Sequence, residues 1–215
     1  MRRHIVCLGD SNTYGYRPEG PLFRFSEEER WTCLLQSLLG REYLILEEGL
    51  PGRTTVFEDP VEEGLSALPY LYPCLKSHAP VDLLVVMLGS NDTKERLNAN
   101  ACAIGKGLTR LVRKAQSIDC WQPGAAPNIL IIAPLAISKE VERSSVAQEM
   151  GVGCVEKSLR VPGQFRAAAK ALGCHFLDAN RLGLVYNQVD HMHLTLESHR
   201  KLAEALARLI PTLFK

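Results

Sequence analysis

Ser11 lies in the stretch HIVCLGDSNTYG, where an apolar run stops at Gly9 and polar residues follow. A serine directly after a strand commonly caps the next helix, because its hydroxyl accepts a hydrogen bond from the first helical turn. The alternative is a nucleophile, which a sharp turn between strand and helix lifts into solvent. Gly9 permits the close backbone approach that such a turn needs. Asp10 is suited either to orient the serine or to serve as an ordinary turn acid.

A second candidate motif, DHMHLT, begins at Asp190 near the carboxyl end of the chain. Asp190 and His193 are three residues apart, so a single turn can bring them side by side. A carboxylate bonded to one ring nitrogen fixes the tautomer of the histidine and stabilises the imidazolium. His193 would then act on Ser11 as general base through its other nitrogen. The alternatives are an acid-capped turn with a surface histidine, and His191 as the base; only the spacing favours His193.

Two further loops contain candidate donors for a developing negative charge. Asn91, in GSNDTK, carries an NH₂ group of the kind that serves in oxyanion holes, although an Asx turn explains it as well. Gly52, in EEGLPGRTT, can present an unshielded backbone N–H, although a glycine after Pro51 is also typical of a plain turn. Each motif alone fits an ordinary turn better than a catalytic role.

A metal site is the competing interpretation of the histidine-rich stretch. Asp190, His191, His193 and His199 are chemically able to bind a divalent ion. The two histidines of H-x-H, however, point to opposite faces of a strand and lie about 200° apart in a helix. No second cluster of ligands in the sequence accompanies this one. We therefore expect no metal here.

Short apolar runs alternate with longer amphipathic segments, which is typical of an α/β fold with a mainly parallel sheet. The expected strands are residues 4–8, 43–49, 81–89, 128–134 and 174–180. Their nearly continuous apolar character fits strands that are covered on both faces. The expected helices are residues 30–40, 65–77, 98–118, 164–172 and 196–213, and Pro69 and Pro73 should shorten or kink the second of them. The pattern predicts a three-layer α/β/α sandwich with a mainly parallel five-stranded sheet of the flavodoxin-like type.

Ligands of such sheets bind outside the carboxyl ends of the strands. The loops after the first three strands carry Ser11, Gly52 and Asn91, so these residues should lie at one edge of the sheet. The segment with Asp190 and His193 comes just before the last helix. A nucleophile candidate, two donor candidates and an acid–base pair at one edge favour a shared catalytic function over coincidence.

Composition narrows the class of protein. The 215 residues suit one domain spanning 1–215, with 46% hydrophobic and 23% charged residues. A net charge of +1 with the two signs interspersed disfavours a nucleic-acid partner. The seven cysteines form no C-x-x-C pair, which excludes zinc-ribbon and thioredoxin-type spacing. The run Ile5–Leu8 is too short for a signal peptide or a membrane span, so we expect a cytoplasmic protein without membrane association.

The order of these motifs resembles that of the GDSL/SGNH hydrolases. The Ser, Gly, Asn and His that give the family its name match Ser11, Gly52, Asn91 and His193, and the likeness runs from about residue 4 to the final helix. Three longer stretches resemble the arylesterase/acyltransferase branch, whose members act on small acyl esters: ERWTCLLQSLLG, EEGLPGRTT and HLTLESHRKLAEAL.

This resemblance implies a role for each matched residue. Ser11 would be acylated, His193 would act as base and then as acid, and Asp190 would orient it. The N–H groups of Ser11 and Gly52 and the amide of Asn91 would form the oxyanion hole. The resemblance also implies no metal or organic cofactor, a small-molecule ester substrate, and assembly into a homo-oligomer.

Two features depart from the family pattern. Asn12 stands where the GDSL motif has leucine, so we expect a polar group at the substrate entrance, with Asp10 and Asn12 as substrate-binding candidates. The segment 139–158 has no strong periodic pattern, and we interpret it as a lid-like or subunit-contact insertion. The alternatives to a small-ester hydrolase are a carbohydrate acetylesterase and a non-catalytic small-molecule binding module.

Overall fold

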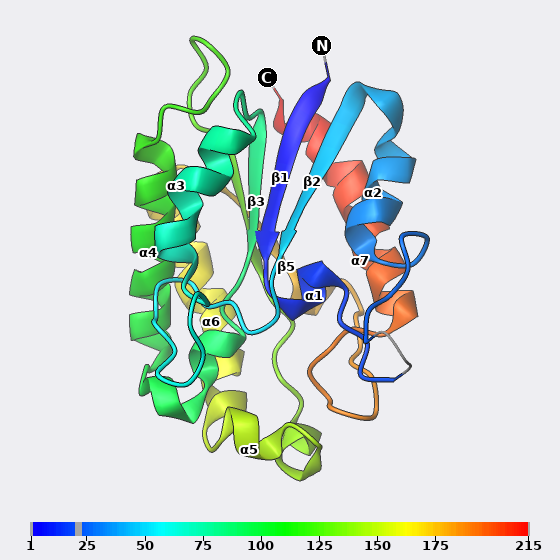
Figure 1. Ribbon diagram of the computed structural model, residues 1–215, viewed down its shortest axis with the longest axis vertical. Helices are drawn as coiled ribbons and strands as arrows, with labels where there is room; N and C mark the ends of the chain where they lie inside the picture. Colours follow the sequence, from blue (N-terminus) through cyan, green and yellow to red (C-terminus); the bar gives the residue numbers. More distant parts are fainter. Residues whose placement is uncertain (1, 20–22, 215) are drawn as a thin grey trace.

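The computed structural model describes residues 2–19 and 23–214. Five parallel strands form one sheet in the order β2-β1-β3-β4-β5 (Figure 1). The strands are β1 (Arg3–Gly9), β2 (Tyr43–Gly49), β3 (Leu83–Met87), β4 (Ile129–Ala133) and β5 (His175–Asp178). This is the flavodoxin-like order, which confirms the fold class predicted from the alternating pattern.

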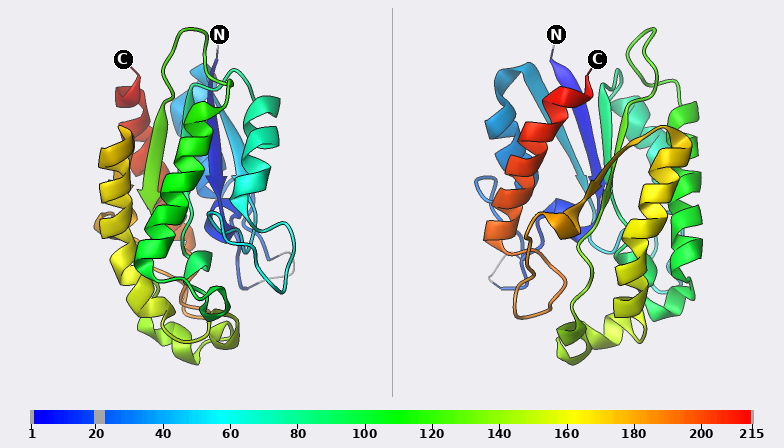
Figure 2. Two further views of the ribbon diagram at one scale, coloured as in Figure 1. Left: turned by 90° about the vertical axis from the view of Figure 1, so that its left-hand side faces the viewer. Right: turned by 180° about the vertical axis from the view of Figure 1, so that it is seen from behind.

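Helices cover both faces of the sheet, which explains why the strands are so apolar. Every residue of β3 and β4 is buried, whereas the edge strands β2 and β5 are mostly half-buried. Three helices cover one face: α3 (Ala67–Ser77), α4 (Ala101–Ser117) and α6 (Cys154–Leu172) (Figure 2). The other face packs on α2 (Trp31–Leu39) and α7 (Leu196–Leu209). The three-layer arrangement is therefore as predicted.

Short helical turns fill the connections between these elements. Two are brief α-helices, α1 (Ser11–Tyr14) and α5 (Ala147–Met150). The others are the 3₁₀ turns η1 (Gly40–Glu42), η2 (Asn91–Thr93), η3 (Glu95–Leu97), η4 (Lys139–Arg143), η5 (Ala179–Arg181) and η6 (Ile210–Leu213). The helix expected over 196–213 thus changes to 3₁₀ geometry at Ile210, just before Pro211.

The largest difference from the sequence-based expectation is the length of α6. It begins at Cys154, although the alanine-rich pattern predicted a start at residue 164. Pro162 lies inside the helix and obscures its pattern, since proline removes a backbone hydrogen bond in a helix interior. Val161, Phe165 and Ala168 are buried against the sheet at helical spacing, and this packing outweighs the unfavourable proline.

The segment 139–158 is compact and forms a small core of its own. It contains η4, α5 and the first turn of α6, and it lies at the lower end of the molecule in Figure 1. Its buried apolar side chains are Val141, Met150, Cys154 and Val155, and they pack with Ile137 just before the segment and with Met192 from the loop before α7. The segment therefore packs against the residue that precedes His193.

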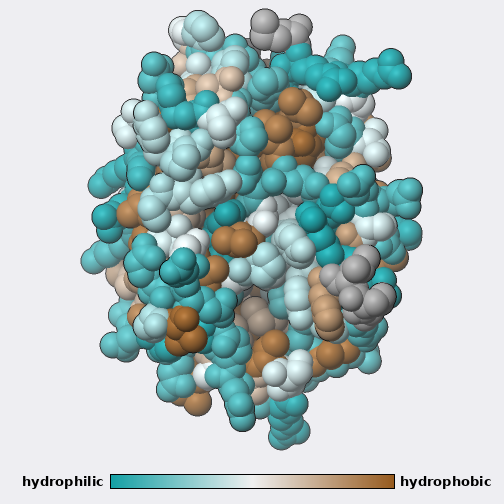
Figure 3. Space-filling view, viewed as in Figure 1, coloured by the Kyte–Doolittle hydropathy of each residue, from teal (hydrophilic) through white to brown (hydrophobic). Residues whose placement is uncertain are grey.

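The surface in Figure 3 is mostly hydrophilic, and hydrophobic side chains on that face form small separate groups. The exposed large hydrophobic residues are Phe23, Leu38, Val61, Tyr72, Val152, Leu159, Val185 and Val189. Within residues 2–19 and 23–214, every helix is too short or too polar to span a lipid bilayer.

Candidate active site

Ser11 is the first residue of α1, immediately beyond the carboxyl end of β1. The cap of this short helix is Asp10, whose Oδ1 accepts the Asn12 N–H at 2.9 Å, so Ser11 does not serve as the cap. The turn is packed closely against the end of β2. A Cβ added to Gly49 would lie 2.2 Å from the Tyr14 backbone nitrogen, so only glycine lets α1 approach the strand this closely.

The loop before α7 brings His193 to Ser11 across 182 residues of sequence. His193 Nε2 lies 2.8 Å from Ser11 Oγ, and His193 Nδ1 lies 2.7 Å from Asp190 Oδ2. The other Asp190 oxygen accepts the backbone N–H groups of Met192 and His193 at 3.0 and 2.9 Å. All three residues are buried, with Ser11 4%, His193 7% and Asp190 1% exposed. The side-by-side arrangement expected for Asp190 and His193 is therefore present.

The electrostatics favour a charged Asp190 beside His193. Burial alone would raise the pKa of the Asp190 carboxyl, but the hydrogen bond and charge of His193 and the two backbone N–H groups lower it to about 2. An ionised carboxylate on Nδ1 holds the proton on that nitrogen and leaves Nε2 free to accept one. The arrangement can thus remove a proton from Ser11 and stabilise the resulting imidazolium.

The two donor candidates lie in loops that are fastened to the same end of the sheet. Asn91 begins η2 after β3, and its Nδ2 donates to the Arg53 carbonyl at 3.1 Å. Gly52 has a φ of +82°, a left-handed conformation that favours glycine, which accounts for the P-G pair in the sequence. Leu50 N donates to the Gly9 carbonyl at 3.2 Å, which ties this loop to the strand that carries the serine turn.

Arg53 is a structural residue that the sequence reasoning missed. Its side chain is 4% exposed, and Nη1 donates to the Gly9 carbonyl at 3.1 Å and also to the Glu48 carbonyl. The guanidinium lies 4.7 Å from the centre of the Tyr70 ring. Burial lowers the pKa of Arg53, opposed by Tyr70 and Glu48. A charged residue directly after a turn glycine, in a loop at the sheet edge, is the only local signal of Arg53 in the sequence, and it does not indicate burial.

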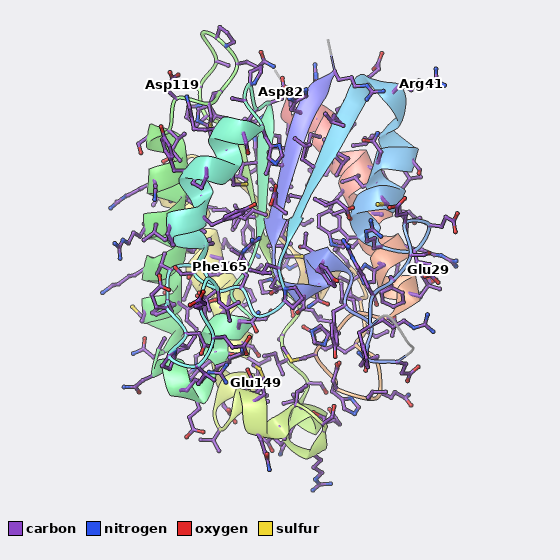
Figure 4. The ribbon with its side chains drawn as sticks, viewed as in Figure 1. Glu29, Arg41, Asp82, Asp119, Glu149 and Phe165 are labelled. Atoms are coloured by element: carbon purple, nitrogen blue, oxygen red, sulfur yellow. The ribbon has the colours of Figure 1, made fainter. Side chains whose placement is uncertain are left out.

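An ion-pair network joins the loops of the donor candidates to the 139–158 segment. Arg96 binds Asp59 and Glu149 at 2.8 and 2.6 Å, and Lys94 binds Glu149 at 2.7 Å. Lys94 is buried, whereas Glu149, labelled in Figure 4, extends from α5 at the lower end of the molecule. The network connects elements far apart in the sequence, so no local pattern could reveal it.

Two buried carboxylates make stability depend on pH. Burial raises the pKa of Asp92 to about 6, against the lowering effect of its bonds from Thr55, and the Asp10 charge adds to the rise. Burial likewise raises the pKa of Asp10 to about 6, opposed by the Asn12 N–H and the charges of His193 and Arg53. Each carboxyl therefore binds its proton more readily in the folded than in the unfolded chain. The free energy of unfolding that they contribute falls as pH rises from about 4 to 6.

We expect Asp92→Asn to remove part of this dependence. The quantity of interest is the free energy of unfolding of the variant minus that of wild type. It should be more positive at pH 7 than at pH 4.5, by on the order of 1 kcal/mol. Comparing the two proteins cancels the opposite effect of His199, whose pKa burial lowers to about 4. Urea unfolding at both pH values measures the difference, and an equal gap at the two values would contradict the assignment.

Aromatic residues flank the histidine on the solvent side. The Tyr16 ring centre lies 4.4 Å from that of His193, and Phe23 stacks on Tyr16 with ring centres 6.4 Å apart. Phe23 is 53% exposed. These two rings form an apolar ledge beside the Ser11–His193 pair.

Asp10 and Asn12, expected at the substrate entrance, instead face the protein. Asp10 is 1% and Asn12 5% exposed. The Asp10 carboxylate accepts from Asn12 N, and the Asn12 side chain bonds to the backbone of Met192 and Leu194. Their polar groups are therefore used within the fold, in contrast to the expected contact with substrate.

The histidines that the sequence offered as a metal cluster have separate roles in the structure. The bonds to Ser11 and Asp190 come from His193, while His191 has a φ of +58°. His199 is buried, and its Nδ1 accepts the Trp31 N–H at 3.1 Å.

A different set of potential metal ligands lies between β2 and α3. The ligand atoms of Glu48, Cys74 and His78 all fall within 4.8 Å of one another, and Cys74 and His78 are one helical turn apart. His78 Nε2 lies 2.6 Å from Glu48 Oε1, and the Tyr70 hydroxyl donates to Glu48 Oε2 at 2.6 Å. The carboxylate is thus already satisfied by these protein groups, and the set shares no residue with the Ser11 site.

The comparison with known proteins agrees with this geometry. The model of the GDSL-like lipase/acylhydrolase family matches residues 7–201. The chain belongs to this family. It is therefore an ester hydrolase of the GDSL/SGNH type, as the order of its motifs indicated.

Solved structures of esterases are similar to this one over nearly the whole chain. The native aryl esterase of M. smegmatis is 31% identical, with a TM-score of 0.89, over 99% of this chain and 100% of that one. Est24, a carbohydrate acetylesterase from Sinorhizobium meliloti, is 33% identical with a TM-score of 0.89 over the same shares. A putative arylesterase from Agrobacterium tumefaciens is 30% identical with a TM-score of 0.87, again over 99% and 100%. No curated protein matches the sequence.

Proposed function

We propose that this GDSL-type hydrolase is a serine esterase that works through an acyl-enzyme. The observation that carries the proposal is the continuous chain of hydrogen bonds from Ser11 Oγ to His193 Nε2 and from His193 Nδ1 to Asp190. A hydroxyl, an imidazole and a carboxylate in this order are the parts that acyl transfer requires.

The reaction proceeds in two steps. Ser11 Oγ attacks the ester carbonyl carbon while its proton passes to His193 Nε2. The bond to the alcohol oxygen then breaks, and the alcohol leaves with the proton from His193. Water attacks the acyl-enzyme in the second step, gives a proton to His193, and releases the carboxylic acid as Ser11 recovers its proton. A second alcohol in place of water would give acyl transfer.

The oxyanion of each tetrahedral intermediate is assigned to the N–H groups of Ser11 and Gly52 and the side-chain amide of Asn91. Asn91 Nδ2 carries two hydrogens and gives one of them to the Arg53 carbonyl, so the second is available for the oxyanion. Donors that are fixed before the reaction begins stabilise the developing charge without reorganisation.

Asn91→Ala should therefore lower kcat by about 10²–10³-fold, the typical cost of one lost oxyanion donor. The measurement is steady-state hydrolysis of p-nitrophenyl acetate. Asn100→Ala is the matched control, because Asn100 caps α4 through the Ala103 N–H and should lose stability while keeping kcat. A kcat for Asn91→Ala within threefold of the control would remove Asn91 from the oxyanion hole.

The substrate class that we propose is small acyl or aryl esters. The ledge of half-buried Tyr16 and exposed Phe23 beside His193 offers an apolar surface for an aromatic alcohol. The similarity to the M. smegmatis aryl esterase supports the same class. The alternative is a carbohydrate acetylesterase, which the similarity to Est24 of Sinorhizobium meliloti supports.

A panel of esters tests these assignments. We expect rapid hydrolysis of p-nitrophenyl acetate, a decline with longer acyl chains, and slow release of acetate from acetylated xylan. Preference for acetylated xylan would favour the carbohydrate acetylesterase. Absence of hydrolysis across the panel, with no initial burst of p-nitrophenol, would favour a binding module.

A further inference from the structure

Asn12 bridges the two sides of His193 with its side chain. Asn12 Oδ1 accepts the Leu194 N–H at 2.9 Å, and Nδ2 donates to the Met192 carbonyl at 3.3 Å. The partners are the residues immediately before and after His193, and they lie 180 and 182 residues away in the sequence. One side chain therefore holds the backbone on both sides of the histidine.

The backbone of Asn12 is held just as firmly as its side chain. Its N–H donates to Asp10 Oδ1 at 2.9 Å, and its carbonyl accepts the indole N–H of Trp31 at 3.1 Å. All of its polar groups are thus bonded in a residue that is 5% exposed. Since Asn12 directly follows Ser11, these bonds fix the turn of the hydroxyl and the loop of the imidazole relative to each other.

The other contacts of the loop hold it in different ways. Asp190 and Asn187 bond to the loop's own backbone, which fixes its internal shape. Met192 packs in the small core of the 139–158 segment, and Leu194 packs in the core beneath α7. These apolar contacts hold the loop against the fold but lack the direction of a hydrogen bond. The directional link from the loop to the serine turn is the Asn12 side chain, together with the Ser11–His193 bond itself.

We propose that Asn12 is a positioning residue that aligns His193 Nε2 with Ser11 Oγ for proton transfer. It acts through the backbone of the His193 loop and makes no contact with substrate. This role rests on the proposed esterase function. It assigns a task to the position where the sequence departs from the GDSL motif, and it replaces the expectation that Asn12 lines the substrate entrance.

Asn12→Leu tests the proposal with a side chain of similar size and no polar atoms. Both bonds to the loop are lost, and the Leu194 N–H and the Met192 carbonyl remain without this partner. We expect kcat to fall about 10–100-fold, because a small misalignment of reacting groups has an effect of this order. KM should stay within about twofold, since binding of the ester does not use Asn12. The rate at which a fluorophosphonate labels Ser11 should fall in parallel with kcat.

Asn180→Leu is the matched control. Asn180 makes a similar pair of hydrogen bonds, with Oδ1 accepting the Ala136 N–H at 2.8 Å and Nδ2 donating to the Pro134 carbonyl at 3.1 Å. It brackets Leu135 in a loop that carries no catalytic candidate. This variant should lower the melting temperature while kcat and the labelling rate stay within about twofold of wild type.

Asn12→Asp provides a partial rescue, because its carboxyl oxygen can still accept the Leu194 N–H. Its kcat should lie between those of Asn12→Leu and wild type. If the leucine variant does not fold, Asn12→Asp is compared with wild type in its place. The proposal is overturned if the folded Asn12 variants keep wild-type kcat and labelling rates, or if Asn180→Leu loses as much kcat. These results differ from failure of the esterase proposal, in which the wild-type protein itself would not be labelled at Ser11.

Discussion

Ser11→Ala should lower kcat for p-nitrophenyl acetate by a factor on the order of 10⁶ and abolish the acyl-enzyme. In the proposed mechanism Ser11 Oγ forms the bond to the acyl carbon in the first step and is released from it in the second, so both steps require this hydroxyl. The change removes one hydrogen bond, to His193 Nε2, and leaves Asp10 as the cap of α1. The variant should therefore fold, which circular dichroism and a thermal melt would check.

Ser66→Ala is the appropriate control for the loss of a buried serine hydroxyl. Ser66 is 1% exposed, and its hydroxyl has no hydrogen-bond partner among the described residues. This variant should hydrolyse the ester at the wild-type rate. The proposed role of Ser11 would be abandoned if Ser11→Ala kept more than about one hundredth of the wild-type kcat.

Asp190→Asn should lower kcat by about 10⁴-fold, the effect known for the corresponding change in a Ser-His-Asp triad. The amide oxygen can keep the bonds from Met192 and His193 backbone N–H groups, so the loop should retain its shape. The amide nitrogen would then face His193 Nδ1 and donate to it. The imidazole would carry its proton on Nε2, the nitrogen that must accept one from Ser11.

The control for Asp190→Asn is Asp178→Asn at the end of β5. Asp178 Oδ1 accepts the Asn180 N–H at 3.1 Å, so it also caps a turn after a strand. We expect this variant to keep kcat within about twofold, measured at pH 7 beside Asp190→Asn. Equal small losses in the two variants would mean that Asp190 is a structural cap and does not orient the base.

The fold was predictable from the sequence because its signal is repeated in each unit. Five continuous apolar runs separated by amphipathic segments leave few arrangements other than a parallel sheet covered on both faces. The placement of Ser11, Gly52 and Asn91 beyond strand ends followed from the same rule. The boundaries of α6 did not follow, because Pro162 breaks the local pattern and only packing of Val161 and Phe165 on the sheet restores the helix.

The details of the site that could not be predicted all depend on contacts between distant segments. The sequence indicated that Asp190 and His193 could pair, since they are neighbours in one turn. It could not indicate that Arg53 is buried against Tyr70, or that Lys94 and Arg96 meet Glu149 on α5. These interactions require the folded arrangement of loops from different strands.

Asn12 illustrates this limit most clearly. It was expected to place a polar group at the substrate entrance, because it stands where the GDSL motif has leucine. The structure satisfies the same amide with the backbone of a loop 180 residues away. The side chain does form polar contacts, as expected, but only the folded structure identifies their partners as the Met192 carbonyl and the Leu194 N–H.

The most direct test of the account is mass spectrometry of the wild-type protein after reaction with a fluorophosphonate. We predict a single adduct on Ser11 that is absent from Ser11→Ala and forms far more slowly in His193→Ala. An adduct on a different serine, or an actively hydrolysing enzyme that remains unlabelled, would contradict the claim that His193 activates Ser11 as the nucleophile.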